Sequence, residues 1–318
     1  MDHRICAIGD LTVDVILHGL SSMPQWGEEL EINRATKRLG GNVGNMAVGA
    51  GALHTDLIVV ADVGDDEGGK FVVQQIKECG LDTRHIREFA HMATSQSYAC
   101  IRGDGERFLL TEKGTLEKIE ATVMQEDIPA SQVIFLGGWC LPPRVCVEYV
   151  VPRLRQWKEK GSVLSTDLIW SEESWEKKQE LLRFLNYFDL VFMNEKELLA
   201  VTECEERDAA IAKLRSLLAL DTREDAAGII KLGAEGACMV TGDDVIYAVP
   251  LPCKPADTVG AGDLFNLGFL HAKYQLRQSW KQAIDFAVAF ASLSISQYGK
   301  SKVTQEAVYH ALQQNTEI

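Results

Sequence analysis

Short, continuous apolar runs separated by helical stretches recur along this chain. The run 57–63, Leu-Ile-Val-Val-Ala-Asp-Val, is apolar at nearly every position, as expected of a strand that is buried on both faces. Shorter runs of this character are expected to form strands at 4–9, 133–136, 162–165 and 190–193. Strands that alternate with helices favour an α/β fold with a doubly wound, mainly parallel sheet flanked by helices. We therefore expect a single domain over residues 1–318, with a late helix over 283–297.

Composition and charge argue against several functional classes. The chain has 318 residues, 46% hydrophobic and 25% charged, which is typical of a soluble globular protein. Its net charge of −14 argues against a nucleic-acid partner, because phosphate neutralisation requires a basic face. No apolar stretch approaches the roughly 20 residues that cross a bilayer, so no membrane partner is expected. The eight cysteines are scattered without a Cys-x-x-Cys pair, which predicts reduced thiols, no zinc site and a cytoplasmic location.

A glycine-rich turn followed by a helix is predicted at 257–270. Gly260 and Gly262 have no Cβ, so the backbone can curl there and direct several N–H groups at one point. The apolar residues that follow suit a buried helix that begins at about Ala261. A helix start presents unpaired N–H donors and the positive end of a dipole. It therefore suits a phosphate or a developing oxyanion.

Asp263, in the first turn of this predicted helix, has two interpretations. A carboxylate at a helix start is a common charge match to the dipole. Beside a pocket built for anions, however, it would repel the ligand unless it took part in the chemistry. The second interpretation makes it a general base for a hydroxyl that attacks a phosphoryl group. Spacing alone does not choose between the two.

Two stretches resemble the signatures of the PfkB (ribokinase-like) carbohydrate kinases. Residues 257–265, Asp-Thr-Val-Gly-Ala-Gly-Asp-Leu-Phe, match the pattern Asp-Thr-x-Gly-Ala-Gly-Asp-x-Phe. Residues 40–47, Gly-Gly-Asn-Val-Gly-Asn-Met-Ala, match Gly-Gly-x-x-x-Asn-x-Ala. The resemblance covers nearly the whole chain in order, and it implies that Asp263 is the catalytic base. It also implies that three residues of the turn hold the transferring phosphoryl group: Gly260, Ala261 and Gly262.

Polar residues near the start of the chain are candidates for binding a sugar. Asp10 and Asp14 follow the first strand, and ligands of open α/β sheets bind at the carboxyl ends of strands. The alternative is a turn aspartate and a solvated strand aspartate. The family places a sugar-binding aspartate in this region, and Asp14 is the better match. Further along, Gly41 lets a ligand approach the backbone, while Asn42 and Asn45 supply donors and acceptors.

A small β-sheet lid is expected from two segments, about 10–38 and 92–112. The second contains two β-like runs around Gly103-Asp-Gly105, which predicts a hairpin. The first contains 24–28, Pro-Gln-Trp-Gly-Glu, which is similar to a Pro-x-x-Gly-Glu segment of the family. That segment leads into a small sheet that covers the sugar. The lid is either a one-sided cover or the contact surface of a homodimer.

The nucleotide side is expected around two later segments. Asn194 and Glu197 fit a helix N-cap and its capping-box partner. The family gives Asn-x-x-Glu at this point a role in holding Mg²⁺ and phosphate through water, and both interpretations are compatible. A later strand–turn–strand segment resembles the family's nucleotide-side segment, which implies that Lys231, Gly233 and Gly236 border the ATP phosphates. ATP and Mg²⁺ are the implied cofactors, and a monovalent cation, K⁺, is left open.

The resulting hypothesis is an ATP-dependent kinase that transfers the γ-phosphoryl group to a hydroxyl of a small neutral sugar. Many 2-keto-3-deoxygluconate and fructose kinases carry Asp-x-Asn-x-Arg where this chain has 167–171, Asp-Leu-Ile-Trp-Ser. The missing Asn and Arg weaken an acid-sugar assignment. Lys37, Arg38 and Arg102 are too scattered in the sequence to predict a phosphosugar site.

Two other functions stay open. A nucleoside kinase of the same family could use Trp26 or Tyr98 to stack on a base. A sugar- or nucleotide-binding regulator could keep the fold without catalysis, although the intact Asp263 argues against this.

Overall fold

The computed structural model describes residues 4–20, 22, 25–102, 107–170, 172–221, 223, 226–297 and 302–316. Within these ranges the strands are β1 (Ile5–Ile8), β2 (Thr12–Leu20), β3 (Arg34–Gly40), β4 (Leu57–Gly64), β5 (Ile86–Phe89), β6 (Gln96–Arg102), β7 (Arg107–Glu112), β8 (Val133–Leu136), β9 (Val163–Asp167), β10 (Leu190–Asn194), β11 (Ala227–Lys231), β12 (Ala237–Val240) and β13 (Val245–Ala248). The α-helices are α1 (Asn42–Leu53), α2 (Glu67–Glu78), α3 (Ile119–Val123), α4 (Val147–Glu159), α5 (Glu172–Glu176), α6 (Lys178–Leu185), α7 (Glu195–Thr202), α8 (Arg207–Leu218), α9 (Ala261–Leu270), α10 (Trp280–Ile295) and α11 (Gln305–Thr316). Shorter helical turns are η1 (Gly114–Lys118), η2 (Gly138–Cys140), η3 (Gly233–Glu235) and η4 (His271–Gln275).

The larger sheet has nine strands in the described ranges, in the order β13-β12-β11-β10-β9-β8-β1-β4-β5. From β5 to β11 every neighbouring pair is parallel, and β12 and β13 form an antiparallel edge. The chain passes from β1 to β4 on one side and later returns to β8 on the other. β1 therefore lies where the strand order reverses, which is the point at which open α/β sheets bind ligands.

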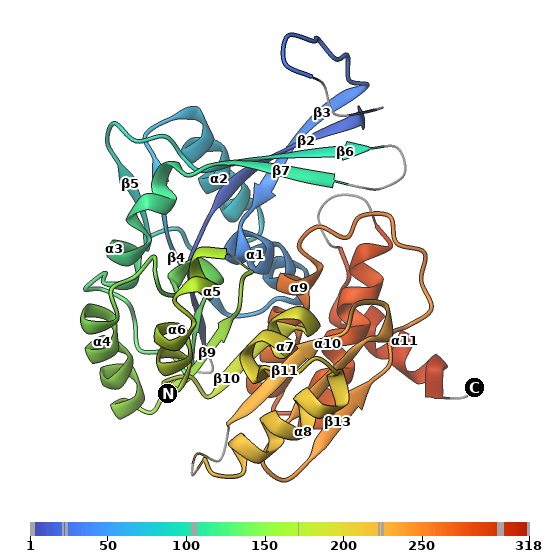
Figure 1. Ribbon diagram of the computed structural model, residues 1–318. Helices are drawn as coiled ribbons and strands as arrows, with labels where there is room; N and C mark the ends of the chain where they lie inside the picture. Colours follow the sequence, from blue (N-terminus) through green and yellow to red (C-terminus); the bar gives the residue numbers. More distant parts are fainter. Residues whose placement is uncertain are drawn as a thin grey trace.

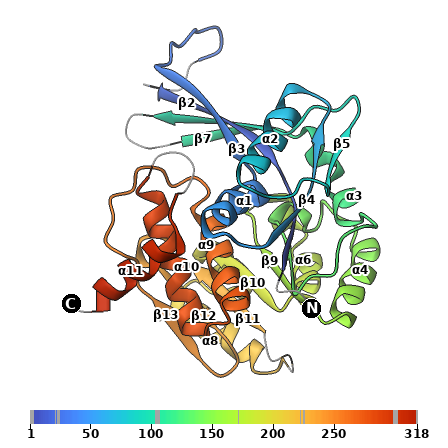
Figure 2. The ribbon, with the colours of Figure 1, turned by 180° about the vertical axis from the view of Figure 1, so that it is seen from behind.

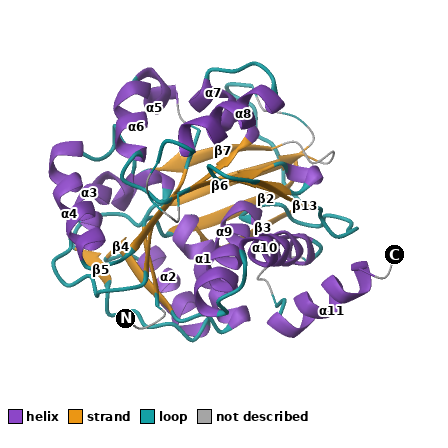
Figure 3. Ribbon diagram, turned by 90° about the horizontal axis from the view of Figure 1, so that it is seen from below, coloured by secondary structure: helices purple, strands orange, loops and turns teal. Residues whose placement is uncertain are grey.

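Helices cover both faces of this sheet (Figure 3). Consecutive strand residues point into different cores: Phe135 and Phe192 belong to one core, and their neighbours Leu136 and Met193 belong to the other. This period of two is expected of strands that are buried on both faces. The predicted doubly wound α/β fold is confirmed. None of the helices in the described ranges has the length and apolar character that a bilayer crossing needs.

The smaller sheet has the strand order β3-β2-β6-β7 and stands at the top of Figure 1, apart from the larger sheet. β2 pairs with β3 antiparallel and with β6 parallel. The chain enters β2 shortly after β1 ends, so Asp14 lies in the small sheet close to the carboxyl end of β1. Seen from behind, α1 lies between this sheet and α9 (Figure 2). The elements that carry the predicted site are therefore adjacent.

Most predicted elements agree with the structure, but the late helix has different ends. We expected 283–297, and α10 runs from Trp280 to Ile295. It begins earlier because Ser279 and Gln282 form a capping box, in which the Ser279 Oγ accepts from the Gln282 N–H and the Gln282 side chain accepts from the Ser279 N–H. β6 and β7 form the predicted hairpin, although its turn at 103–105 and Pro24 lie outside the described residues.

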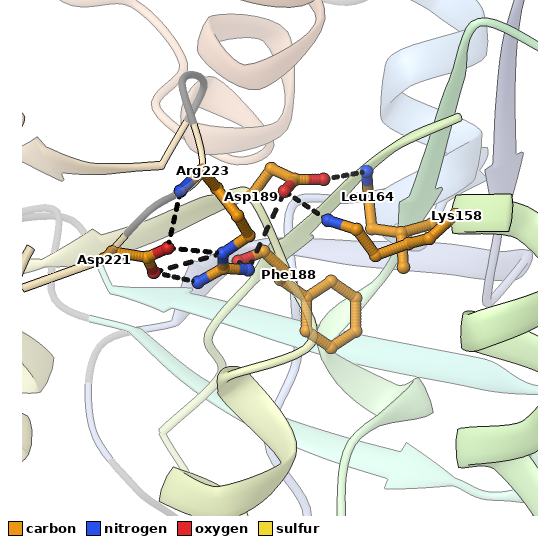
Figure 4. A network of polar contacts seen from close by, with 6 residues as sticks. All are labelled: Lys158, Leu164, Phe188, Asp189, Asp221 and Arg223. Carbon is orange, nitrogen blue, oxygen red and sulfur yellow. Dashed lines mark hydrogen bonds and ion pairs between the residues drawn. The ribbon is translucent and has the colours of Figure 1, made fainter. Parts of the chain in front are cut away.

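A buried polar network lies at the amino-terminal ends of β9 and β10 (Figure 4). One carboxylate oxygen of Asp189 accepts from the Leu164 N–H at 2.9 Å, and the other pairs with Lys158. The Arg223 guanidinium lies 3.7 Å from the same carboxylate and donates to the Phe188 carbonyl at 2.7 Å. The candidate site lies at the opposite, carboxyl-terminal ends of these strands.

Candidate active site

Gly260 packs the glycine turn against α1. It is the N-cap of α9 and has a φ of 79°, in the left-handed region. A Cβ at this position would lie 2.7 Å from the Cγ of Asn45. Glycine therefore suits this position for two reasons: it adopts the backbone conformation without strain, and it leaves room for the Asn45 amide. The predicted turn and the predicted helix start at Ala261 are both present.

Two amide side chains from the first turn of α1 hold the carboxylate of Asp263. Asn42 Nδ2 donates to one oxygen and Asn45 Nδ2 donates to the other, each at 2.8 Å. The Asn42 amide is itself oriented, because its oxygen accepts from the Gly138 N–H at 3.2 Å. The structure thus brings together Asn42, Asn45 and Asp263, the three residues predicted to share one site. The two asparagines, predicted as substrate contacts, also position the predicted base.

The surroundings of Asp263 raise its pKa to about 7. Burial is the largest cause, and the negative charge of Asp167 acts in the same direction. The hydrogen bonds from the two asparagines and the charge of Lys231 lower the pKa and only partly compensate. A general base functions best when its pKa lies near the working pH. Asp263 is therefore suited to exchange a proton near neutrality.

Asp167, at the carboxyl end of β9, is a second buried carboxylate in this site. Lys231 Nζ lies 2.7 Å from both of its oxygens, and Asn266 Nδ2 donates to one of them at 2.8 Å. Asn266 lies about one helical turn after Asp263 on α9. Lys231 Nζ also lies 3.4 Å from the point where a Cβ on Gly262 would be. The lysine therefore connects Asp167 with the glycine turn.

Asn194 and Glu197 form a capping box at the start of α7, as predicted. Asn194 Oδ1 accepts from the Glu197 N–H at 2.9 Å, and the Glu197 carboxylate accepts from the Asn194 N–H at 2.8 Å. Glu197 is only 2% exposed. Burial raises its pKa to about 7, and the charge of Asp167 contributes in the same direction. Glu197 is thus a helix cap and also a buried carboxylate that interacts with the charge of Asp167.

A cavity of about 630 Å³ adjoins the glycine turn. The predicted phosphate contacts Lys231, Gly233 and Gly236 line it together with Ala261 and Gly262. Its apolar walls come from the segment after β13 and from α10: Pro250, Leu251, Val288, Ala291 and Ile295. Ligand pockets commonly have this volume, with a largely apolar lining and a few polar groups. The cavity suits the nucleoside part of ATP, with the phosphates directed at the turn.

Asp10 and Gly41 lie together at the carboxyl end of β1. A Cβ on Gly41, whose φ is 85°, would lie 2.4 Å from the Asp10 carbonyl oxygen. One side-chain oxygen of Asp10 accepts from the Asn42 N–H at 3.3 Å, while no donor among the described residues reaches the other. Burial raises the pKa of Asp10 to about 6. A buried carboxylate oxygen without a donor is suited to accept a ligand hydroxyl.

Asp14 on β2 faces two neighbours. The Thr12 hydroxyl donates to one carboxylate oxygen at 3.0 Å, and Arg38 Nε lies 3.7 Å from the other. Burial raises the pKa of Asp14, and the positive charge of Arg38 acts in the opposite direction. Arg38 is one of the charges that are too scattered in the sequence to predict a site, yet it lies beside the best candidate for a sugar contact.

The described ranges contain no group of three or more His, Cys, Asp and Glu side chains that could hold a metal ion. Three buried carboxylates, those of Asp167, Glu197 and Asp263, nevertheless face one cation, Lys231. This excess of negative charge fits a Mg²⁺ ion that arrives with a nucleotide. Proteins commonly hold Mg²⁺ with one or two carboxylates together with phosphate oxygens and water.

Three residues of the site carry no prediction from the sequence: Asp167, Asn266 and Arg38. Asp167 ends a buried strand, so the rule that we applied to Asp10 also indicates this position. Asn266 lies on the same face of α9 as Asp263, a signal that helical periodicity provides. Arg38 has no local signal, because its place follows from how β3 pairs with β2.

A doubly wound sheet with a second, four-stranded sheet beside it, and a buried aspartate where a helix begins at a glycine turn, define a ribokinase-like phosphotransferase. The comparison with known families agrees. The model of the pfkB family carbohydrate kinases matches residues 2–307, and the chain belongs to this family. The family predicted from the two signatures is thereby confirmed.

Individual relatives are distant and differ in substrate. A bifunctional ribokinase/ribose-5-phosphate isomerase A of Fructilactobacillus sanfranciscensis is 25% identical over 98% of this chain, which spans only 56% of that protein. A 5-dehydro-2-deoxygluconokinase of Clostridium perfringens is 24% identical over 90% of this chain and 87% of its own length. The crystal structure of a putative ribokinase II from E. coli, in complex with ATP and Mg²⁺, superposes with a TM-score of 0.79 at 19% identity. The superposition covers 98% of this chain and 99% of the ribokinase II chain, and it shows that the two share a fold.

Proposed function

We propose that this chain is an ATP-dependent kinase that phosphorylates a hydroxyl of a small neutral sugar. The observation that carries the proposal is the position of Asp263. It is buried, held by two amides, and placed beside a glycine turn that adjoins a nucleotide-sized cavity. Family membership supports the transfer of a phosphoryl group to a sugar, and the distant relatives leave the particular sugar open.

In the proposed reaction the sugar hydroxyl gives its proton to Asp263 while its oxygen attacks the γ-phosphorus of ATP. The bond between that phosphorus and the β–γ bridging oxygen breaks, and ADP leaves. Gly260, Ala261 and Gly262 contribute backbone N–H groups that stabilise the charge on the transferring phosphoryl group. Lys231, which lies against the turn, adds a positive charge there.

Mg²⁺ bound to the ATP phosphates would neutralise part of their charge. Asn194 and Glu197 are the residues that we expect to hold it through water, with Asp167 as a further carboxylate close by. The putative ribokinase II that contains ATP and Mg²⁺ supports this cofactor pair. Whether the enzyme depends on K⁺ is tested by comparing its activity in potassium salts and in lithium salts.

A neutral sugar fits the polar groups on the substrate side. Asp10 and Asp14 offer carboxylate oxygens as acceptors. The charge of Arg38 is already matched by two carboxylates, so it is not available for an anionic sugar group. A nucleoside has less support, because Trp26 is fully exposed and Tyr98 lies half-buried on β6.

The small sheet would act as a lid over the sugar, within a single domain over 1–318. Its strands fall in the segments at about 10–38 and 92–112, with β3 ending at Gly40. Closure would exclude water and suppress ATP hydrolysis. We also propose pairing of two lids in a homodimer, and a cytoplasmic location, which the eight free cysteines support.

ADP release with Mg-ATP tests the proposal across neutral sugars, acid sugars, sugar phosphates and nucleosides. We expect one or more neutral sugars to give turnover that Asp263→Asn abolishes. Turnover with nucleosides alone would replace the sugar by a nucleoside. ATP binding without turnover on any compound would favour a regulator that lacks catalysis.

A further inference from the structure

Arg38 connects the small sheet to the glycine-turn segment. It lies on β3, directly across from Asp14 on β2 in the antiparallel register. Its Nη1 donates to Asp257 Oδ2 at 2.5 Å, and its Nε lies 3.7 Å from Asp14 Oδ2. Asp257 is the first residue of the segment that forms the turn. One guanidinium therefore contacts both the predicted sugar side and the predicted phosphoryl side of the site.

Asp257 is a fixed point from which the turn starts. Its backbone N–H donates to the Ile295 carbonyl at 3.0 Å, and its Oδ1 accepts from the Val259 N–H at 3.0 Å. The second bond is an Asx-type turn, which sets the direction of the chain just before Gly260. The remaining oxygen, Oδ2, is the one that Arg38 binds. The guanidinium therefore completes the restraints on this aspartate.

The charges in this group depend on Arg38. Asp14 and Asp257 repel each other, and their side chains are only 12% and 17% exposed. A cation between two partly buried carboxylates allows both to stay ionised and close together. Without it, the repulsion between the two carboxylates would separate them. That separation would move a sugar contact or the start of the phosphoryl turn.

The Arg38 guanidinium also has N–H donors that no described residue accepts. Nε and Nη2 of Arg38 are hidden from solvent, and no described residue accepts a hydrogen bond from them. Buried donors without acceptors cost free energy. A sugar hydroxyl bound at Asp14 would be an acceptor for Nε, since a hydroxyl both donates and accepts. Sugar binding would then hold the guanidinium, and with it Asp257, in place.

We propose that Arg38 is a positioning residue that couples sugar binding at Asp14 to nucleotide binding at the glycine turn through Asp257. This inference rests on the proposed function. Because coupling between two ligands is reciprocal, each ligand should increase the affinity for the other by the same factor. A bound sugar thereby prepares the turn for ATP, and the site is completed only when both are present.

The test compares Arg38→Gln with Lys37→Gln. Lys37 is the preceding residue on β3, is exposed and carries the same charge, so it is a matched control. Binding of the non-hydrolysable analogue AMP-PNP with Mg²⁺ is measured by calorimetry, with and without the sugar that is turned over fastest, D-ribose and D-fructose being tried first. We expect the sugar to tighten AMP-PNP binding in the wild type and in Lys37→Gln. In Arg38→Gln this enhancement should fall about fivefold or more.

A merely structural role of Arg38 would lower the amount of folded protein without changing the enhancement per folded molecule. Arg38→Lys keeps the charge but not the planar fork, and should restore the enhancement in part. It also serves as the test variant if Arg38→Gln does not fold. Two outcomes overturn the inference in a protein that still turns over the sugar. One is an unchanged enhancement in both Arg38 variants, and the other is an equal loss of enhancement in Lys37→Gln. A wild type that turns over no sugar refutes the proposed function itself and the inference with it.

Discussion

Two clusters of buried carboxylates lie at opposite ends of the same strands and differ in how their charge is matched. At the amino-terminal end of β10, Asp189 pairs with Lys158, accepts from the Leu164 N–H and lies 3.7 Å from Arg223 (Figure 4). At the carboxyl-terminal end, the hydrogen bonds that Asp263 accepts from described residues come from two neutral amides, and the charges of Asp167 and Lys231 act on it in opposite directions. The first cluster is balanced within the chain, and the second is not.

The difference indicates what each cluster does. A buried carboxylate whose charge and hydrogen bonds are matched ties segments together, here β9, β10 and α4. A buried carboxylate whose charge is only partly compensated, as at Asp263, has a raised pKa and keeps a capacity for protons or metal ions. Strained or poorly compensated groups of the second kind tend to mark functional sites, where they lower stability. The comparison can be tested by neutralising one aspartate in each cluster.

The largest effect is expected on catalysis. Asp263→Asn removes the base but keeps the shape of the side chain, so the turnover number for the active sugar should fall by about a thousandfold. AMP-PNP should still bind, because the cavity is unchanged. The measurement is steady-state ADP release, with Asp285→Asn on α10 as the control, since Asp285 forms a partly exposed pair with Lys281 and is not among the residues that line the cavity. A turnover number within tenfold of the wild type would remove Asp263 from the mechanism.

The next effect is on stability and concerns the balanced cluster. Asp189→Asn leaves Lys158 without its buried partner and weakens the bond to Leu164, while Arg223 keeps its pair with Asp221. We expect the free energy of unfolding to fall by about 3 kcal/mol. The same substitution in the more exposed pair, Asp285→Asn, should cost less than about 1 kcal/mol. Urea denaturation measures both, and kcat at 25 °C should be unchanged in each. Equal losses in the two variants would contradict the distinction between the networks.

The sequence predicts the local parts of both regions well. Apolar runs indicated the strands, and the spacing of Asn194 and Glu197 indicated a helix cap that the structure contains. The glycine turn and the helix start at Ala261 were also predictable, because both depend on neighbouring residues. What these features share is that a few consecutive residues decide them.

Contacts that depend on strand order and register were not predictable in the same way. Arg38 reaches Asp257 across 219 positions, and Lys231 reaches Asp167 across 64. Neither contact follows from a local pattern. The contact of Arg38 requires the pairing of β2 with β3, and the contact of Lys231 requires that β9, β10 and β11 be neighbours in the sheet. The charge imbalance at Asp263 is likewise a property of the assembled site.

A smaller effect concerns the stability of the unbalanced cluster. The pKa of Asp263 rises from its ordinary 3.8 to about 7 on folding, so between these values the native state binds more protons than the unfolded state. Stability from this group is then lost as pH rises towards 7. Asp263→Asn should therefore raise the free energy of unfolding by about 2.5 kcal/mol more at pH 8 than at pH 5. An equal change at both pH values would show that charge is not the cause.

The smallest effect is expected on the pH dependence of catalysis. In the wild type, kcat/KM for the sugar should increase as pH rises through about 7, because the ionised form of Asp263 is the base. Asn42 and Asn45 donate to this ionised form and so lower its pKa. Asn42→Ala should therefore move the midpoint to higher pH, so that rates below neutrality fall several-fold while rates at high pH recover.

The control for this shift is Asn186→Ala, the same substitution at an exposed helix end away from the site. A loss of rate in Asn42→Ala that is constant across pH would mean that Asn42 contacts the substrate without affecting the base. A midpoint that moves to lower pH would contradict the assignment of the titrating group to Asp263, since removing a donor cannot stabilise its carboxylate. The direction of the shift thus tests whether the unbalanced aspartate is held ready for a proton by these neutral amides.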